Sequence, residues 1–246
     1  MKKRTLETTA FSLHLMAMAF MLCDHLWATL IPGQDWMTCV GRIAFPIFAF
    51  MIVEGYFHTH DLKKYVLRLL LFALISEIPF NLMVGSSMVY PYHQNVLWTF
   101  LLGIFMIWLI ERARATGKGW LLGLTVVLTG LLGAILGLLL MVDYFSVGVL
   151  TILVFYLFRG DRWYHKLFQF IMLYYLNVEL MGGLGYEVTL FGHELFIQQQ
   201  AFALLALLPI WMYRGRQGYH SRAYQIGCYA FYPVHLLILG LLQMYR

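Results

Sequence analysis

Long apolar runs separated by short polar segments dominate the chain. A transmembrane helix needs about 20 mainly apolar residues, and shorter helices are tolerated inside a bundle. This criterion predicts about nine membrane-spanning helices, at residues 8–31, 38–57, 65–84, 95–110, 119–141, 145–158, 167–181, 196–213 and 224–245. We therefore expect an all-α integral membrane protein, folded as a single polytopic domain over residues 1–246.

The basic residues follow the same pattern, because they fall on every alternate connecting segment. Apart from Arg42 and Arg246, the lysines and arginines are Lys2, Lys3, Arg4, Lys63, Lys64, Arg68, Arg112, Arg114, Lys118, Arg159, Arg162, Lys166, Arg214, Arg216 and Arg222. Cytoplasmic loops carry an excess of Lys and Arg. The sequence thus predicts a cytoplasmic amino terminus in the cell's inner (cytoplasmic) membrane and, after nine crossings, an outer carboxyl terminus.

The composition excludes a water-soluble domain and points to the lipid bilayer as the main partner. Of the residues, 61% are hydrophobic and 12% are charged, and the mean hydropathy is +0.73. The net charge of +5 is explained by the basic cytoplasmic loops, so we expect no nucleic-acid partner. Gly130, Gly133 and Gly137 predict a close-packing stripe on their helix.

Polar residues inside the apolar runs are the candidates for function, because an ionisable group at membrane depth is costly unless it is paired or hydrated. In the predicted topology most of them fall toward the outer ends of their helices, which indicates a cavity open to the outside. Besides the residues of the first two helices, the candidates for this cavity are Glu54, Glu77, Asn95, Asp143 and His235.

The first helix carries two histidines on one face. His14 and His25 are 11 residues apart, which is about three turns and about 16 Å along a helix. Asp24 precedes His25, and Arg42 at the outer start of the second helix is its most obvious cationic partner. A carboxylate that orients an imidazole is typical of general-base catalysis, whereas a structural ion pair joining two helices is the alternative interpretation.

Metal and nucleotide motifs are missing from the sequence. His58, His60 and Asp61 are residue types that bind metals, but no further ligand is in register with them, and a solvated helix end explains them. No Walker loop, dinucleotide fingerprint or nucleophile elbow is present. We expect neither a metal nor a prosthetic group.

The motifs resemble those of the TraX-like family, named for a factor that acetylates the pilin of conjugative F-type pili. The resemblance covers essentially the whole chain. It rests on MLCDH at 21–25, GRIAFPIF at 41–48, VEG at 53–55, SEIPF at 76–80 and FYPVH at 231–235, together with Asn95 and Asp143.

The resemblance implies a chemistry, because this family is similar to a wider group of transmembrane acyltransferases. In that group a first-helix histidine is catalytic and acetyl-CoA is the cytoplasmic donor, which assigns catalysis to His25 with Asp24 and Arg42. The group often has Arg or Lys, ten residues and then His, and here His14 takes the basic position. The resemblance therefore places His14 in binding of the acetyl-CoA cofactor.

The predicted function is acetyl transfer from cytoplasmic acetyl-CoA to an acceptor on the outer side of the membrane. A pilin-like protein and an envelope glycan or peptide are the candidate acceptors. A proton-coupled transporter or permease is one alternative, since Asp, Glu and His residues in membranes also form proton relays. A non-catalytic factor in the assembly of pili or envelope polymers is the other.

Overall fold

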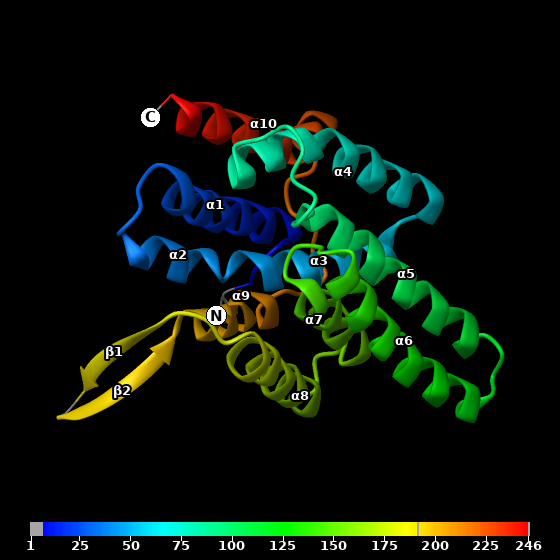
Figure 1. Ribbon diagram of the computed structural model, residues 1–246. Coiled ribbons are helices and arrows are strands. Elements are labelled where there is room, and N and C mark those ends of the chain that lie inside the picture. Colours follow the sequence, from blue (N-terminus) through cyan, green and yellow to red (C-terminus); the bar gives the residue numbers. More distant parts are fainter. Residues whose placement is uncertain (1–6, 191, 246) are drawn as a thin grey trace, which may run out of the picture. The chain divides into compact units, whose positions relative to one another are not determined.

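The computed structural model describes residues 7–190 and 192–245, which are mostly helical and contain ten α-helices (Figure 1). The basic residues Lys2, Lys3, Arg4 and Arg246 lie outside the described residues. The chain divides into two compact units. Unit 1 comprises Met1–Met51 and Gly160–Phe231, and unit 2 comprises Ile52–Arg159 and Tyr232–Arg246. The helices α3 (Ala44–His58) and α10 (Arg222–Met244) each contribute to both units.

Unit 1 begins with a long helix that packs against a short one, α1 (Ala10–Thr29) beside α2 (Asp35–Gly41) (Figure 1). The first turn of α1 is closed by a capping box, in which Thr9 and Ser12 satisfy each other's backbone N–H groups. The rest of the unit contains α8 (Trp163–Tyr174), a π-helical stretch (Tyr175–Met181), strands β1 (Gly185–Leu190) and β2 (His193–Gln198), a 3₁₀ helix (Gln199–Ala206) and α9 (Leu207–Trp211).

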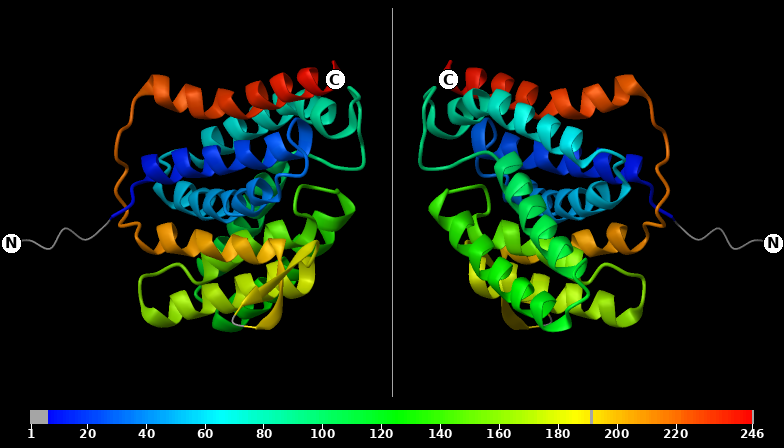
Figure 2. Two further views of the ribbon diagram at one scale, coloured as in Figure 1. Left: turned by 90° about the vertical axis from the view of Figure 1, so that its left-hand side faces the viewer. Right: turned by 90° about the vertical axis from the view of Figure 1, so that its right-hand side faces the viewer.

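Unit 2 is built from four complete helices, α4 (Leu62–Gly85), α5 (Val96–Arg114), α6 (Gly119–Leu139) and α7 (Phe145–Leu157). Figure 2 shows α5, α6 and α7 packed side by side, and their contacts form the core of the unit. Ile107, Ile152 and Phe155 are almost completely buried there. The second half of α10 packs against the end of α4, where Gly240 lies next to the Leu82–Met83 backbone.

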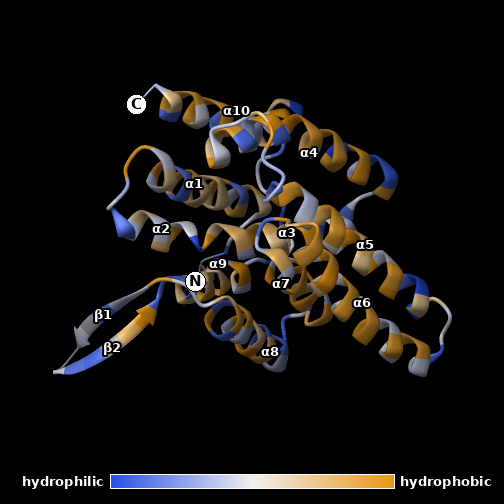
Figure 3. Ribbon diagram, in the orientation of Figure 1, coloured by the Kyte–Doolittle hydropathy of each residue, from blue (hydrophilic) through white to orange (hydrophobic). Residues whose placement is uncertain are grey.

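Within residues 7–190 and 192–245, six helical stretches are long and apolar enough to cross a membrane, so the protein is a multi-pass membrane protein. They are Ala10–Thr29, Asp35–His58, Leu62–Gly85, Val96–Arg114, Gly119–Leu139 and Arg222–Met244. Helix α6 is the most apolar of them, yet only 17% of its hydrophobic window is buried within the protein (Figure 3). Such a surface suits contact with lipid.

The second predicted helix, 38–57, is divided in the structure between α2 and α3. Pro46 accounts for the break, because a proline ring clashes with the carbonyl of the residue four positions earlier, which here is Arg42. The helix restarts at Ala44 and places Pro46 in its first turn, where no backbone N–H donor is needed.

The region 182–213 differs most from the sequence prediction. We expected a helix over 196–213, but residues 196–198 belong to β2, and the helical part is Gln199–Trp211. The antiparallel hairpin pairs Gly185 with Gln198 and was not predicted. The described residues also include apolar helices shorter than the six long ones, Phe145–Leu157 among them. The count of nine crossings and the cytoplasmic amino terminus therefore stay predictions.

Candidate functional site: polar clusters within the helices

The second half of α1 carries a carboxylate that is neutralised across the helix pair α1 and α2. Nη2 of Arg42 donates to both carboxylate oxygens of Asp24, at 2.5 and 2.7 Å. The two side chains are 17% and 18% exposed. The cation proposed from the sequence as a partner for Asp24 is thus its partner in the structure.

Two neutral residues complete this group, which we call the Asp24 cluster (Asp24, Thr38, Arg42 and Gln199). The hydroxyl of Thr38 donates to Oδ1 of Asp24 at 2.7 Å and is fully buried. Because that hydroxyl gives its proton to the carboxylate, it accepts from Nε2 of Gln199 at 2.7 Å. The cluster therefore joins α1, α2 and the 3₁₀ helix within unit 1.

A glycine allows the two helices to come this close. A Cβ atom added to Gly41 would lie 2.7 Å from Cγ of Asp24, which no ordinary packing permits. Gly41 ends α2, and the next residue, Arg42, caps that helix through its own backbone N–H to the Thr38 carbonyl. The sequence Gly41-Arg42 thus supplies both the space for the carboxylate and the cation that neutralises it.

His25 follows Asp24 on α1 and is half-buried. Successive side chains on a helix are turned by about 100°, so the imidazole and the carboxylate leave the helix in different directions. The backbone carbonyl of His25 accepts from the Thr29 hydroxyl at 2.6 Å. The interactions described above for the Asp24 carboxylate are with Arg42 and Thr38. Orientation of the His25 ring by Asp24 therefore remains a prediction.

His14 lies near the start of α1 and has a defined donor atom. Its Nδ1 is 3.1 Å from the Ala10 carbonyl oxygen. A carbonyl oxygen only accepts, so Nδ1 carries the proton of this bond. The neutral ring in this tautomer presents Nε2 as an acceptor. The ring also meets Tyr224 edge-on, with the centroids 6.5 Å apart.

Unit 2 contains a second polar group, centred on Glu77 of α4. Oε2 of Glu77 accepts from Nδ2 of Asn95 at 2.5 Å and from Nε1 of Trp98 at 3.0 Å. Asn95 is fully buried and caps α5, with its side-chain oxygen accepting from the Leu97 N–H. The structure thus brings together two predicted cavity residues, Glu77 and Asn95, at the start of α5.

Asp143 pairs with a histidine that was not among the predicted site residues. Nε2 of His93 lies 3.1 Å from Oδ1 of Asp143. Burial disfavours the charged ring, but the hydrogen bond that the ring donates to Asp143 and the negative charges of Asp143 and Glu77 outweigh it, so the pKa of His93 is raised. The feature of the sequence that pointed to His93 as a site residue was its position two residues before the helix cap Asn95.

The remaining two candidates have structural partners of their own. Oε1 of Glu54 lies 2.6 Å from Nε of Arg159. The other carboxylate oxygen of Glu54, Oε2, lies 3.7 Å from Nδ1 of His58. His235 is buried, and its ring meets Tyr232 edge-on at 5.8 Å. In the described part of the chain, no three His, Cys, Asp or Glu side chains gather as metal ligands would.

Comparison with known proteins places the chain in a family. The model of the TraX protein family matches residues 11–243. The chain belongs to the TraX family. It is also similar to the probable fimbrial assembly protein FimC, serogroup H1, of Dichelobacter nodosus, with 25% identity and 98% of each chain covered. No solved structure matches it. The TraX match includes the Asp24 cluster, His25 and the polar group around Glu77.

Proposed function

We propose that this TraX-family membrane protein transfers an acetyl group from cytoplasmic acetyl-CoA to an acceptor on the outer side of the inner membrane. The observation that carries the proposal is a half-buried histidine, His25, next to the neutralised Asp24–Arg42 pair on an apolar helix. Ionisable groups in such a place are costly and are generally retained for function. The resemblance to transmembrane acyltransferases supplies the reaction.

In the simplest route His25 acts as the general base. Its imidazole removes a proton from an acceptor amine or hydroxyl, whose nitrogen or oxygen then bonds to the acetyl carbonyl carbon. The carbon–sulfur bond of the thioester breaks, and the coenzyme A thiolate takes up a proton to leave as the thiol. In the second route the His25 nitrogen bonds to the acetyl carbonyl carbon as the carbon–sulfur bond breaks, and coenzyme A leaves as the thiol after taking up a proton. The acceptor amine or hydroxyl then bonds to the same carbon, the bond from that carbon to His25 breaks, and the acceptor loses its proton.

Arg42 is the group proposed to stabilise the negative oxygen that forms during either route. The carboxylate of Asp24 and the hydroxyl of Thr38 hold the guanidinium in place, and a preorganised cation stabilises a developing oxyanion without reorganisation. His14, about 16 Å from His25 along α1, is proposed to contact the acetyl-CoA donor. The basic loops would attract the phosphates of the donor.

The acceptor is proposed to be a pilin-like subunit or another envelope polymer. The support is the name of the D. nodosus relative, a probable fimbrial assembly protein. The experiment compares envelope proteins and glycans from cells with and without the gene by mass spectrometry. Material heavier by one acetyl group only when the gene is present supports the proposal, and identical envelopes under conditions of pilus expression contradict it.

The name of the same relative favours a second candidate, a non-catalytic factor for fimbrial assembly. In that case binding surfaces would matter and the imidazole would not. Cells carrying His25→Gln would then assemble fimbriae normally, with no change in envelope acetylation. Loss of acetylation in that variant, with the protein still present in the membrane, favours the enzyme instead.

A further inference from the structure

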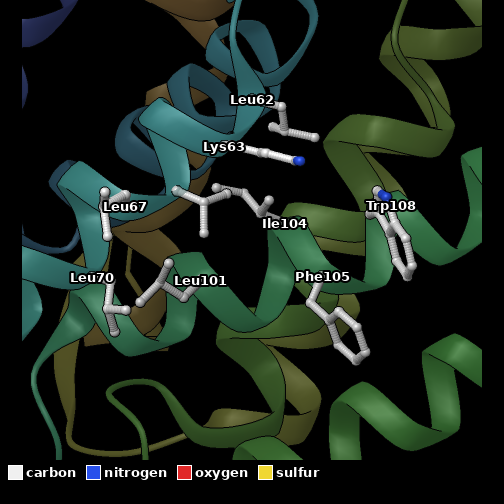
Figure 4. Close-up of a pocket in the computed structure, with 9 residues that line it drawn as sticks. Leu62, Lys63, Leu67, Leu70, Leu101, Ile104, Phe105 and Trp108 are labelled. Carbon is white, nitrogen blue, oxygen red and sulfur yellow. The ribbon is translucent and has the colours of Figure 1, made fainter.

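A groove runs between α4 and α5 on the surface of unit 2. Its volume is about 390 Å³, and it is lined by apolar side chains except at one end. Figure 4 shows Leu67 and Leu70 from α4 and Leu101 and Phe105 from α5 along the groove, with Lys63 at its end. Ile104, which is 3% exposed, closes the floor.

The length of the groove is less than the depth of one membrane leaflet. From Lys63 to Leu70 the helix rises by about 10 Å, and half of the hydrocarbon core measures about 15 Å. The antiparallel helix α5 returns over the same distance, from Leu101 to Trp108. The groove therefore starts at the charged end of the helix pair and ends before the middle of the membrane.

The groove is open to the surface. Its volume of about 390 Å³ extends over about 10 Å along the two helices. A flexible hydrocarbon chain fits, and the exposed walls, Leu67 and Phe105, leave the groove open along its side.

The charged end has the chemistry of a headgroup site. Lys63 is exposed, and among the described residues no carboxylate pairs with its ammonium, whereas the ammonium of its neighbour Lys64 lies 3.3 Å from Asp61. Trp108 lines the same end, and the guanidinium of Arg112 lies 5.0 Å from its ring centroid. Tryptophan with basic residues is typical of the membrane interface.

We propose that this groove binds one anionic phospholipid, with an acyl chain between Leu67 and Phe105 and the phosphate against Lys63. The inference goes beyond acetyl transfer and does not depend on it. Because the basic loops are predicted to be cytoplasmic, the lipid comes from the cytoplasmic leaflet. An anionic headgroup there gains about 1 kcal/mol for each nearby lysine, which corresponds to about a fivefold preference.

The test uses the full chain in phosphatidylcholine vesicles that contain a trace of a lipid with a photoreactive acyl chain. The trace lipid is phosphatidylglycerol in one arm and phosphatidylcholine in the other, and labelled peptides are mapped by mass spectrometry. We expect phosphatidylglycerol to label residues 62–70 and 101–108 about fivefold more than phosphatidylcholine does. Equal labelling of these residues by the two lipids in the wild-type protein would by itself overturn the proposal.

The matched variants are Lys63→Ala and Lys64→Ala, because the two lysines are adjacent and only Lys63 lines the groove. Lys63→Ala should remove the preference for phosphatidylglycerol at the groove, and Lys64→Ala should preserve it. An equal loss in both variants would show general surface attraction and overturn the site. Equally strong phosphatidylglycerol labelling along α6, which also exposes apolar residues, would overturn it too.

Discussion

The neutralisation of buried charge decides the arrangement at the scale of single residues. The Asp24 carboxylate is neutralised by one guanidinium and also accepts a hydrogen bond from one hydroxyl, so removal of Arg42 leaves an uncompensated charge in an apolar region. The Glu77 carboxylate is stabilised differently, because it accepts hydrogen bonds from two neutral donors, the side chains of Asn95 and Trp98. The first arrangement keeps a fixed cation, Arg42, on the carboxylate that precedes His25 in the sequence, and the second has no cation bonded to Glu77 among the contacts described above.

A pH-dependent stability is expected from the pair His93–Asp143. The folded protein holds the His93 proton more tightly than the unfolded chain, because its pKa is raised above the usual 6.5. The stabilisation is therefore complete below pH 6.5 and is lost as the pH rises through the folded-state pKa. Thermal unfolding of the detergent-solubilised protein, measured across this range, should show the loss.

The controls for this prediction are His93→Gln and His60→Gln. The first should flatten the decline in stability above pH 6.5, and the second, at an exposed position, should reproduce the wild-type profile. A His93→Gln protein whose stability follows the wild-type curve over the whole range would show that the pair does not act in this way.

The charged members of the Asp24 cluster could be paired from the sequence, and the neutral members could not. Asp24 and Arg42 are costly in apolar helices, so each needs a partner, and Arg42 is the cation nearest to Asp24 along the chain. Thr38 and Gln199 carry no such demand, since a hydroxyl or amide finds partners in many places. Their contact bridges 161 positions of sequence, which no local pattern encodes.

Close packing between the helices of unit 2 depends on where glycine leaves room for a neighbouring helix. The glycine stripe predicted for α6 is present at Gly133 and Gly137, which lie against neighbouring atoms, but it was wrong for Gly130, which has nothing within 4 Å of its added Cβ. The spacing of the three glycines predicted which face of α6 packs closely. It did not predict how far along α6 the contact with α7 extends.

Gly137→Ala should destabilise the protein, whereas Gly130→Ala should not. A Cβ at 137 would lie 2.6 Å from the backbone oxygen of Phe145, and backbone has no rotamer with which to move away. Overpacking of this kind costs about 1–3 kcal/mol, while alanine at the open position is neutral or gains up to about 1 kcal/mol in helix propensity. The free energy of unfolding of both variants measures the difference, and equal values would contradict the packing of α6 against α7.

Element types followed the hydropathy pattern wherever the helices are long. The break at Arg42 and Ile43 was available from Pro46 but was hidden by the continuous apolar run around it. The hairpin was missed because most of it lies between the apolar windows 167–181 and 196–213, and its last three residues fall inside the second window. The alternation over Tyr186, Glu187, Val188 and Thr189, followed by Gly192, is a strand-and-turn signal in the sequence. Gly192 adopts a φ of +81° in the structure.

Topology is the question for the whole molecule. The described part of the chain contains six long spans, and its shorter helical segments decide whether the chain crosses the membrane an even or an odd number of times. The basic loops predict nine crossings, because this count places Arg159, Arg162 and Lys166 on the same side of the membrane as the other basic loops. Nine crossings place the two termini on opposite sides.

Reporter fusions distinguish these counts. With nine crossings, a periplasmic reporter such as alkaline phosphatase should be active at the hairpin turn, Gly192, and at the carboxyl terminus. Green fluorescent protein should be fluorescent at the loop near Thr116. A fluorescent, phosphatase-negative fusion at the carboxyl terminus would contradict the nine-crossing topology.

Acetyl transfer through His25 is the central claim, and its most direct test is a transfer assay with radiolabelled acetyl-CoA. Purified protein in vesicles is mixed with envelope material from cells lacking the gene, and the label on the acceptor is counted. We predict transfer by the wild-type protein, transfer at least about 100-fold slower with His25→Gln, and a wild-type rate with the exposed control His60→Gln, all at equal folded yield. Transfer at the wild-type rate by His25→Gln would contradict the account.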